Sequence, residues 1–217
     1  MAALEPLEGP AEFEAEVGYA GAPRSREAPG GDTPRRLLNA YSRDPVFKHW
    51  ARSDSIRRQL AALMGTPDIA MSQCHHNCVM TKYPGFSSAT LWHQDIRYWS
   101  FDAPELVSFW LALGAETARN GALRVIPGSH RVELERGRLD AELFLRPELA
   151  ENKALIREAV TVELEPGDAL LFHSRLFHAA GKNLSDDVKL SAVFTYHDAS
   201  NSPIPGTRSS QFPGIAL

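Results

Sequence analysis

The four residues Trp92-His93-Gln94-Asp95 place an imidazole and a carboxylate two positions apart. If this segment is a β-strand, alternate side chains share a face, so His93 and Asp95 project together while Gln94 points to the other face. Two histidines and one carboxylate on one face bind non-haem Fe(II) and leave positions open for a substrate and dioxygen. The pair therefore predicts two of the three ligands of an iron site.

The third ligand has to come from a distant strand, and His178 is the best candidate. It follows the turn 166–168 (PGD) and the apolar stretch Ala169–Phe172, which places it at the end of a strand. His173 competes for this role, but we expect it to pack or to form a hydrogen bond instead. The predicted ligand set is therefore His93, Asp95 and His178.

A second cluster of metal-binding residue types spans residues 74–78 (CHHNC) and suggests zinc as an alternative. Zinc sites of this kind use a second cysteine pair elsewhere, and the chain has only two cysteines. On a strand His75 and His76 would face opposite sides, so they could not easily bind one ion. We therefore expect structural roles for this cluster, and for His49, His130 and His197.

The elements that must position these residues are short β-strands between Gly/Pro turns, backed by early helices. Strands are expected at 79–83, 106–113, 122–126, 160–164, 169–172 and 190–196, with a helix at about 147–158. Thr33-Pro34 predicts a short helix start, and further helices are expected after Asp44-Pro45 and from Ser53 to Gly65. The fold class expected is mainly β with supporting helices, closed as a sandwich or barrel.

The domain organisation expected is simple. Residues 1–34 hold many Pro, Gly and acidic residues and predict a weakly ordered segment, part of which could pack as an edge strand. Residues 35–217 predict one domain, with the helices supporting the β-structure. The tail from Ser200 is rich in Ser, Pro and Gly and predicts an irregular segment.

Composition excludes several classes of protein. With 23 basic and 27 acidic residues the 217-residue chain carries a formal charge of -4 and no basic block, which argues against nucleic-acid binding. No apolar run is long enough to span a membrane, and the N-terminus lacks a secretory pattern. Two cysteines make no disulfide framework, so we expect a cytoplasmic protein.

Several segments resemble the phytanoyl-CoA dioxygenase family of Fe(II)/2-oxoglutarate oxygenases, including its ectoine hydroxylase branch. The matching segments are Lys82-Tyr83-Pro84, His93-Gln94-Asp95, Phe109-Trp110, residues 120–130 (NGALRVIPGSH), the turn 166–168, and His178 with Gly181. They occur in the family's order over about residues 70–197, and the run 120–130 is the most specific. The resemblance implies a double-stranded β-helix (a jelly-roll, cupin-like fold) and iron held by His93, Asp95 and His178.

The resemblance also implies a site for 2-oxoglutarate. The family places a basic residue eleven positions after the second histidine to pair with the distal carboxylate of this co-substrate. Here that position is Lys189, where the family normally has Arg, and Ala180 replaces the family's small hydroxyl residue. Lys makes a single-point contact where Arg makes a two-pronged one. Lys82, Trp110 and Gln94 match positions near the co-substrate in relatives.

The reaction implied is oxidation of a small-molecule substrate by dioxygen, with conversion of 2-oxoglutarate to succinate and CO2. A carboxylate at Asp95 favours hydroxylation, or another oxidation such as desaturation, over halogenation, because related halogenases have a small residue there. Trp99 matches an aromatic position of the ectoine hydroxylase branch, so it and Arg97 are candidates for the substrate pocket. The changes at Lys189 and Ala180 leave an alternative open, a jelly-roll metal-binding protein that is non-catalytic or does not use 2-oxoglutarate. The sequence predicts neither the substrate nor the oligomeric state.

Overall fold

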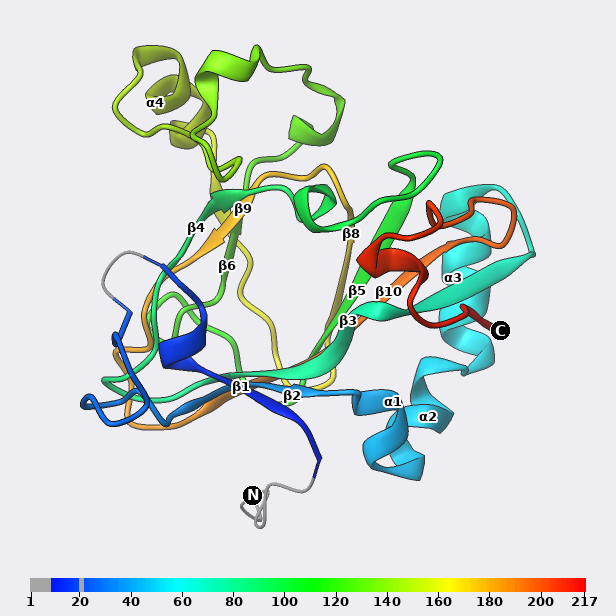
Figure 1. Cartoon of the computed structure of the whole chain (residues 1–217), viewed down its shortest axis with the longest axis horizontal. Coiled ribbons are helices and arrows are strands. Elements are labelled where there is room, and N and C mark those ends of the chain that lie inside the picture. The colour runs from blue at the N-terminus through cyan, green and yellow to red at the C-terminus, as the bar shows by residue number, and fades with distance from the viewer. Residues whose placement is uncertain (1–8, 20–21) are drawn as a thin grey trace.

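Two antiparallel sheets form the centre of the molecule in the computed structural model, which describes residues 9–19 and 22–217 (Figure 1). The larger sheet has the strand order β1-β2-β3-β10-β5-β8, with β11 also paired to β3, and the smaller sheet has the order β4-β9-β6-β7. The larger sheet comprises β1 Ala11–Phe13, β2 Pro34–Leu38, β3 Ile69–Lys82, β5 Leu106–Ala112, β8 Ala169–His173, β10 Lys189–Asp198 and β11 Ile215–Ala216. The smaller sheet comprises β4 Thr90–His93, β6 Leu123–Val125, β7 Val160–Thr161 and β9 His178–Ala180.

In the part of the chain that the structure describes, four α-helices accompany the sheets: α1 Ala40–Arg43, α2 Pro45–Ala51, α3 Asp54–Met64 and α4 Ala150–Arg157. Local chemistry sets the ends of α3, because the Ser53 hydroxyl accepts a hydrogen bond from the Ile56 amide and Gly65 ends the helix at φ 71°. Asp44 caps α2 in the same way. The helices expected after Asp44-Pro45 and from Ser53 to Gly65 are thus confirmed, as is the helix near residues 147–158.

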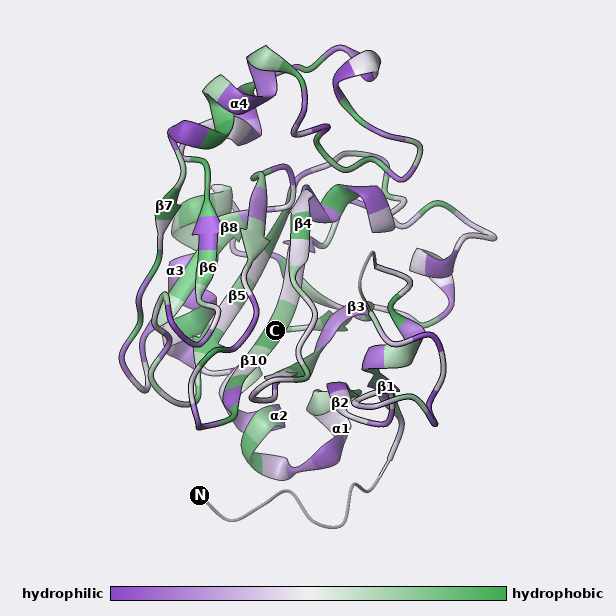
Figure 2. Ribbon diagram, turned by 90° about the vertical axis from the view of Figure 1, so that its left-hand side faces the viewer, coloured by the Kyte–Doolittle hydropathy of each residue, from purple (hydrophilic) through white to green (hydrophobic). Residues whose placement is uncertain are grey.

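The first three helices pack on the large sheet through an apolar core. Trp50 of α2 meets the rings of Phe109 and Phe194, with centroid distances of 5.0 and 5.8 Å. The Tyr196 hydroxyl donates to the carbonyl of Ala51, 2.8 Å away, and so ties β10 to the end of α2. A second apolar cluster includes residues of both sheets: Trp110, Leu123, Phe172, Ala180 and Val193. Figure 2 shows the hydrophobic stretches of the central strands β5 and β10.

The N-terminal part of the chain differs from one expectation. Pro34–Leu38 forms strand β2 and not the start of a helix, because it pairs with β3 along Arg36–Leu38 and with β1 on its other side. Proline is tolerated at the first residue of a strand, where no ladder hydrogen bond is needed. The expected edge strand is confirmed by β1. The segment expected to be weakly ordered, residues 1–34, lies partly outside the described residues, at 1–8 and 20–21.

A bulge in β3 has consequences for the site. β3 and β10 pair in register except between Phe194, which pairs with Asn77, and Thr195, which pairs with Ser72. Four residues of β3, 73–76, are therefore extra to the ladder, and strict side-chain alternation is lost there. As a result His75 and His76 both contact the ring of Trp99, at centroid distances of 5.3 and 5.5 Å. The expectation that they face opposite sides is wrong for this reason.

Among residues 9–19 and 22–217, no helix has the length and apolar character needed to cross a membrane.

Candidate metal and co-substrate site

The three expected metal ligands lie together at one end of strands β4 and β9 of the smaller sheet. His93 ends β4 and His178 begins β9, and the two are direct partners in the antiparallel ladder. Asp95 lies two residues beyond the end of β4, at the first position of a short 3-10 helix, Asp95–Tyr98. Their ligand atoms lie within 4.8 Å of one another, and all three side chains are buried. Two residues close in sequence and one far away thus form one cluster.

Each imidazole is held with one ring nitrogen free. The Nδ1 atoms of His93 and His178 lie 2.8 and 3.0 Å from the carbonyl oxygens of Leu91 and Leu176. A backbone carbonyl accepts only from a protonated nitrogen, so both Nε2 atoms are left as acceptors facing Asp95. These Nε2 atoms lie 3.6 and 3.5 Å from Asp95 Oδ1. Burial lowers the pKa of His178 to about 4, so this imidazole is neutral near pH 7.

The Asp95 carboxylate has one oxygen that is hydrogen-bonded and one that is available to a cation. Its Oδ2 accepts a hydrogen bond from Ser108 (3.3 Å) and lies 3.5 Å from His76 Nδ1, whereas its Oδ1 is buried with no hydrogen-bond partner. Burial acts to raise the pKa of Asp95, but the surrounding imidazoles, His76 first, outweigh it and hold the pKa below its usual range. A buried oxygen without a partner is costly. The two free Nε2 atoms and this oxygen therefore fit a divalent metal ion such as Fe(II).

The run 120–130 positions His178. Val125 of β6 pairs directly with His178, and the amide of Ile126 donates to the carbonyl of Phe177. After the turn at Gly128, the Ser129 hydroxyl accepts from the Phe177 amide at 2.9 Å. The chain immediately before the ligand is thus fixed on both sides by this run. His130 lies beside His173 and is not part of the cluster.

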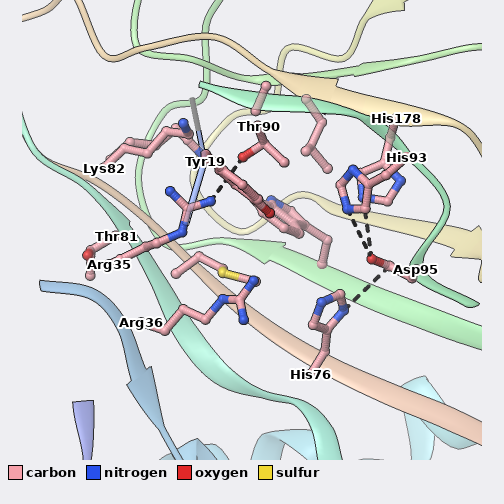
Figure 3. Close-up of a pocket in the computed structure, with 15 residues that line it drawn as sticks. Tyr19, Arg35, Arg36, His76, Thr81, Lys82, Thr90, His93, Asp95 and His178 are labelled. Carbon is pink, nitrogen blue, oxygen red and sulfur yellow. Dashed lines mark hydrogen bonds and ion pairs between the residues drawn. The ribbon is translucent and has the colours of Figure 1, made fainter. Parts of the chain in front are cut away.

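A pocket opens from the metal ligands toward β2, β3 and β9 (Figure 3). Figure 3 shows His93 and His178 turned toward Asp95, with Arg35 and Lys82 in the opposite part of the pocket. Its lining contains four basic side chains, from Arg35, Arg36, Lys82 and Lys189, and apolar groups from Met80, Trp110, Leu123 and Ala180. Such a lining favours an anionic ligand.

Lys82 and Trp110 both line this pocket, whereas Gln94 does not. The Lys82 ammonium donates to the carbonyls of Ser88 (2.9 Å) and Gly181 (2.7 Å), and burial lowers its pKa to about 7. The Gln94 side chain donates to the carbonyl of Arg175, on the side that strand alternation predicts. The structure thus places two of these three residues with Lys189 around one cavity.

Lys189 also lines the pocket, but its ammonium is already paired. It donates to Glu116 Oε2 at 3.0 Å and to the Ser191 hydroxyl at 3.1 Å, and both charged side chains are buried. No motif or spacing singles out Glu116 in the sequence. The backbone of Glu116 forms an isolated bridge with Leu164, and its carboxylate lies beside Lys189 and Ser191 of β10.

Of the two candidate substrate-pocket residues, Trp99 lines a cavity and Arg97 does not. Trp99 lines a second cavity that shares Tyr19, Arg36 and His76 with the first. Arg97 lines neither cavity, because its guanidinium stacks on the Phe144 ring, 3.8 Å from the centroid. Arg208, from the C-terminal tail, supplies a basic group to the second cavity instead.

Sequence reasoning missed His76, Arg35 and Glu116. The signal for His76 was present in its spacing from Cys74 and Cys78, but the bulge that turns it toward Asp95 is a feature of strand pairing. Arg35 was assigned to a helix start, and as part of β2 it points into the pocket. His173 is as expected, since it bonds to Glu105 at 2.8 Å.

Comparisons with known proteins agree with this arrangement. The family model described as phytanoyl-CoA dioxygenase (PhyH) matches residues 12–191. A phytanoyl-CoA dioxygenase 1 from Oryza sativa subsp. japonica is 29% identical over 142 residues, which is 65% of this chain and 49% of the relative. An ectoine dioxygenase from Halomonas elongata is 27% identical over 195 residues, which is 80% of this chain and 56% of the relative.

Solved structures agree on the fold. The apo form of EctD from S. alaskensis superposes with a TM-score of 0.68 at 21% identity, covering 85% of this chain and 64% of that one. The expected jelly-roll fold is thereby confirmed. The chain spans about half the length of the curated relatives it matches. Because the family model covers most of the sequence, the chain belongs to the phytanoyl-CoA dioxygenase family.

Proposed function

We propose that this protein is an Fe(II)- and 2-oxoglutarate-dependent dioxygenase that hydroxylates a small molecule. The overall reaction converts a C–H substrate, 2-oxoglutarate and dioxygen into the hydroxylated product, succinate and CO2. The observation that carries the proposal is the convergence of two free Nε2 atoms and the unpartnered Oδ1 of Asp95 on one pocket with basic walls.

His93, Asp95 and His178 would hold the metal. Bound Fe(II) supplies the redox chemistry by which dioxygen is activated, while the protein supplies position and a protected cavity. Ser108 orients Asp95 by donating to Oδ2, which leaves Oδ1 directed at the two imidazoles. The apolar groups of Trp110 and Leu123 exclude water from one wall.

The basic side chains of the pocket would bind the co-substrate. Lys82 has carbonyl partners but no carboxylate partner among the described residues, so its charge is not compensated. Arg35 shares its nearest acid, Glu14 at 3.5 Å, with the amide of Ser88. An anionic co-substrate beside these two groups would offset the cost of their burial.

The substrate would occupy the second cavity, next to the metal ligands. It is lined by Tyr98 and Trp99, which suit an apolar or aromatic body, and by Arg36 and Arg208, which suit a carboxylate or phosphate. Arg36 Nη1 is paired with Glu12 at 3.3 Å, but its Nε is buried with no hydrogen-bond partner. Arg208 lines the same cavity and has no ion-pair partner within 4.0 Å among the described residues. The substrate proposed is therefore a small molecule that carries an anionic group.

The test of the function is succinate release. Wild-type protein incubated with Fe(II), ascorbate, oxygen and 2-oxoglutarate should form succinate slowly even without substrate, and the variant His93→Ala should form none. His173→Ala is the control, since its imidazole bonds to Glu105 outside the cluster. Absence of succinate from an iron-loaded wild type, with every candidate substrate added, would contradict the proposal.

One observation favours a second candidate, a metal-binding jelly-roll protein that does not use 2-oxoglutarate. Lys189 stands at the position where relatives bind the co-substrate, but its ammonium already forms an ion pair with Glu116. Iron bound by the three ligands without any 2-oxoglutarate binding would support this candidate.

A cytoplasmic location remains part of the proposal, supported by the free thiols of Cys74 and Cys78, and cell fractionation tests it.

A further inference from the structure

Lys189, which lines the co-substrate pocket, forms a buried ion pair with Glu116. The Lys189 ammonium donates to Glu116 Oε2 (3.0 Å) and to the Ser191 hydroxyl (3.1 Å), and it stands 5.0 Å from the centre of the Trp110 ring. Lys189 is 4% exposed and Glu116 is 1% exposed. The charge of Lys189 therefore has a permanent counterion that solvent does not screen.

Both oxygens of Glu116 are held. Oε1 accepts from the Trp110 indole at 2.8 Å and from the Ser191 hydroxyl at 2.5 Å, while Oε2 accepts from Lys189. The backbone of Glu116 is fixed as well, because it exchanges two hydrogen bonds with Leu164, at 2.8 and 3.0 Å. Three donors and a paired backbone hold this carboxylate in place.

A second carboxylate cannot gain the full attraction of Lys189 in this arrangement. A carboxylate placed near the ammonium would also lie close to Glu116, where two like charges repel each other in a buried environment. Attraction to one group and repulsion from the other then largely cancel. Ala180, which lines the same pocket, has no hydroxyl to add a compensating hydrogen bond.

We propose that Glu116 is a selectivity residue, which competes for Lys189 with the distal carboxylate of the 2-oxo acid. The inference rests on the proposed function and deepens it, since it assigns the co-substrate preference to a residue of this chain. It follows that the distal carboxylate depends on Lys82 and Arg35 more than on Lys189. It also follows that Glu116 lowers the preference of the site for 2-oxo acids that carry a second carboxylate.

The experiment measures dissociation constants by calorimetry under anaerobic conditions with Fe(II) bound. The probes are 2-oxoglutarate and 2-oxobutanoate, which shares the 2-oxo acid group but has no second carboxylate. Glu116→Gln should tighten 2-oxoglutarate binding about tenfold or more, because it frees the charge of Lys189, and should leave 2-oxobutanoate within about twofold. The glutamine oxygen still accepts from Trp110 and Ser191, which supports folding.

A second variant removes both charges and so avoids an unpaired buried lysine. Glu116→Gln combined with Lys189→Met should bind 2-oxoglutarate within about threefold of the wild type, because the two charges already cancel. Glu165→Gln is the control, since it removes one negative charge from an exposed position on the adjacent segment. It should change neither affinity.

The outcomes separate this inference from the proposed function. A loss of about tenfold or more in the double variant would show that Lys189 anchors the distal carboxylate despite Glu116, and would overturn the inference alone. The same holds if Glu116→Gln folds and binds 2-oxoglutarate no tighter than the wild type. If the iron-loaded wild type binds neither 2-oxo acid, the proposed co-substrate and the inference both fail.

Discussion

His93 and His178 are cross-strand partners, paired in the ladder between β4 and β9, and their ring centres lie 4.3 Å apart. Backbone pairing of the smaller sheet thus brings together two imidazoles that are far apart in the sequence. The carbonyls of Leu91 and Leu176 then orient both rings in the same way. The metal geometry is therefore a property of strand register, and a change in register would remove it.

The first prediction concerns metal binding and stability. Adding Fe(II) anaerobically should raise the melting temperature of the wild type by several degrees, because the ion satisfies the buried Oδ1 of Asp95 and binds only the folded state. A chelator should reverse the change. His178→Ala should show no shift and no bound iron by elemental analysis, whereas His173→Ala should behave as wild type. A full iron complement in His178→Ala would place the metal elsewhere.

The second prediction concerns the groups that orient Asp95. Ser108→Ala removes the hydrogen bond to Oδ2, and His76→Leu removes the nearby imidazole. Each change should weaken Fe(II) affinity about tenfold while leaving the three ligands in place, since outer partners of a metal ligand commonly contribute this much. Competition against a metal-binding dye measures the affinity. His75→Leu is the matched control, because His75 bonds to Ser209 and not to Asp95.

The third prediction concerns pH. Burial, together with Arg35 and Lys189, lowers the pKa of Lys82 to about 7, below its ordinary value of 10.5. Between these values the unfolded chain binds the proton and the folded chain does not, so stability rises with pH through this window. The slope from this group is at most about 1.4 kcal/mol per pH unit.

Urea unfolding at pH 7, 8.5 and 10 checks this prediction, with Lys82→Met as the test variant. The wild type should gain unfolding free energy from Lys82 as the pH rises, and Lys82→Met should lose that part of the rise. Lys153→Met, at a position on α4 where the lysine is exposed, is the control and should retain the wild-type slope. Parallel curves for the wild type and Lys82→Met would contradict the lowered pKa.

The fourth prediction concerns Gly121, at the start of the run that positions His178. Its φ is +81°, and a Cβ there would lie 2.6 Å from the carbonyl oxygen of Gly181 and 3.1 Å from Lys82 Cδ. Gly121→Ala should therefore destabilise the fold by about 1–3 kcal/mol and weaken anion binding in the pocket. Gly137→Ala, where no atom lies within 4 Å, is the control. Denaturant unfolding and co-substrate calorimetry on both variants separate strain from a general effect of substitution.

The sequence alone determined the features that depend on neighbouring residues. The caps at Ser53 and Gly65 predict α3, and the Gly/Pro turns predict part of β3 together with β5, β6, β7, β8 and β10. The prediction that His93 and Asp95 project to the same side is correct, although β4 ends at His93. Gln94 continues the extended backbone for one more residue, which keeps both side chains on one side. With the matched motifs, these patterns led to the family and the fold.

Only the tertiary structure decided what surrounds the ligands. Thr33-Pro34 predicts the start of a helix, but pairing with β3 makes this segment a strand and directs Arg35 into the pocket. The neighbouring strands supply the backbone hydrogen bonds that a helix would otherwise make within itself. The bulge in β3 turns His76 to Asp95, and a bridge between distant segments sets Glu116 against Lys189. Each of these contacts joins residues far apart in the chain, so charge compensation at the site is not visible in sequence spacing.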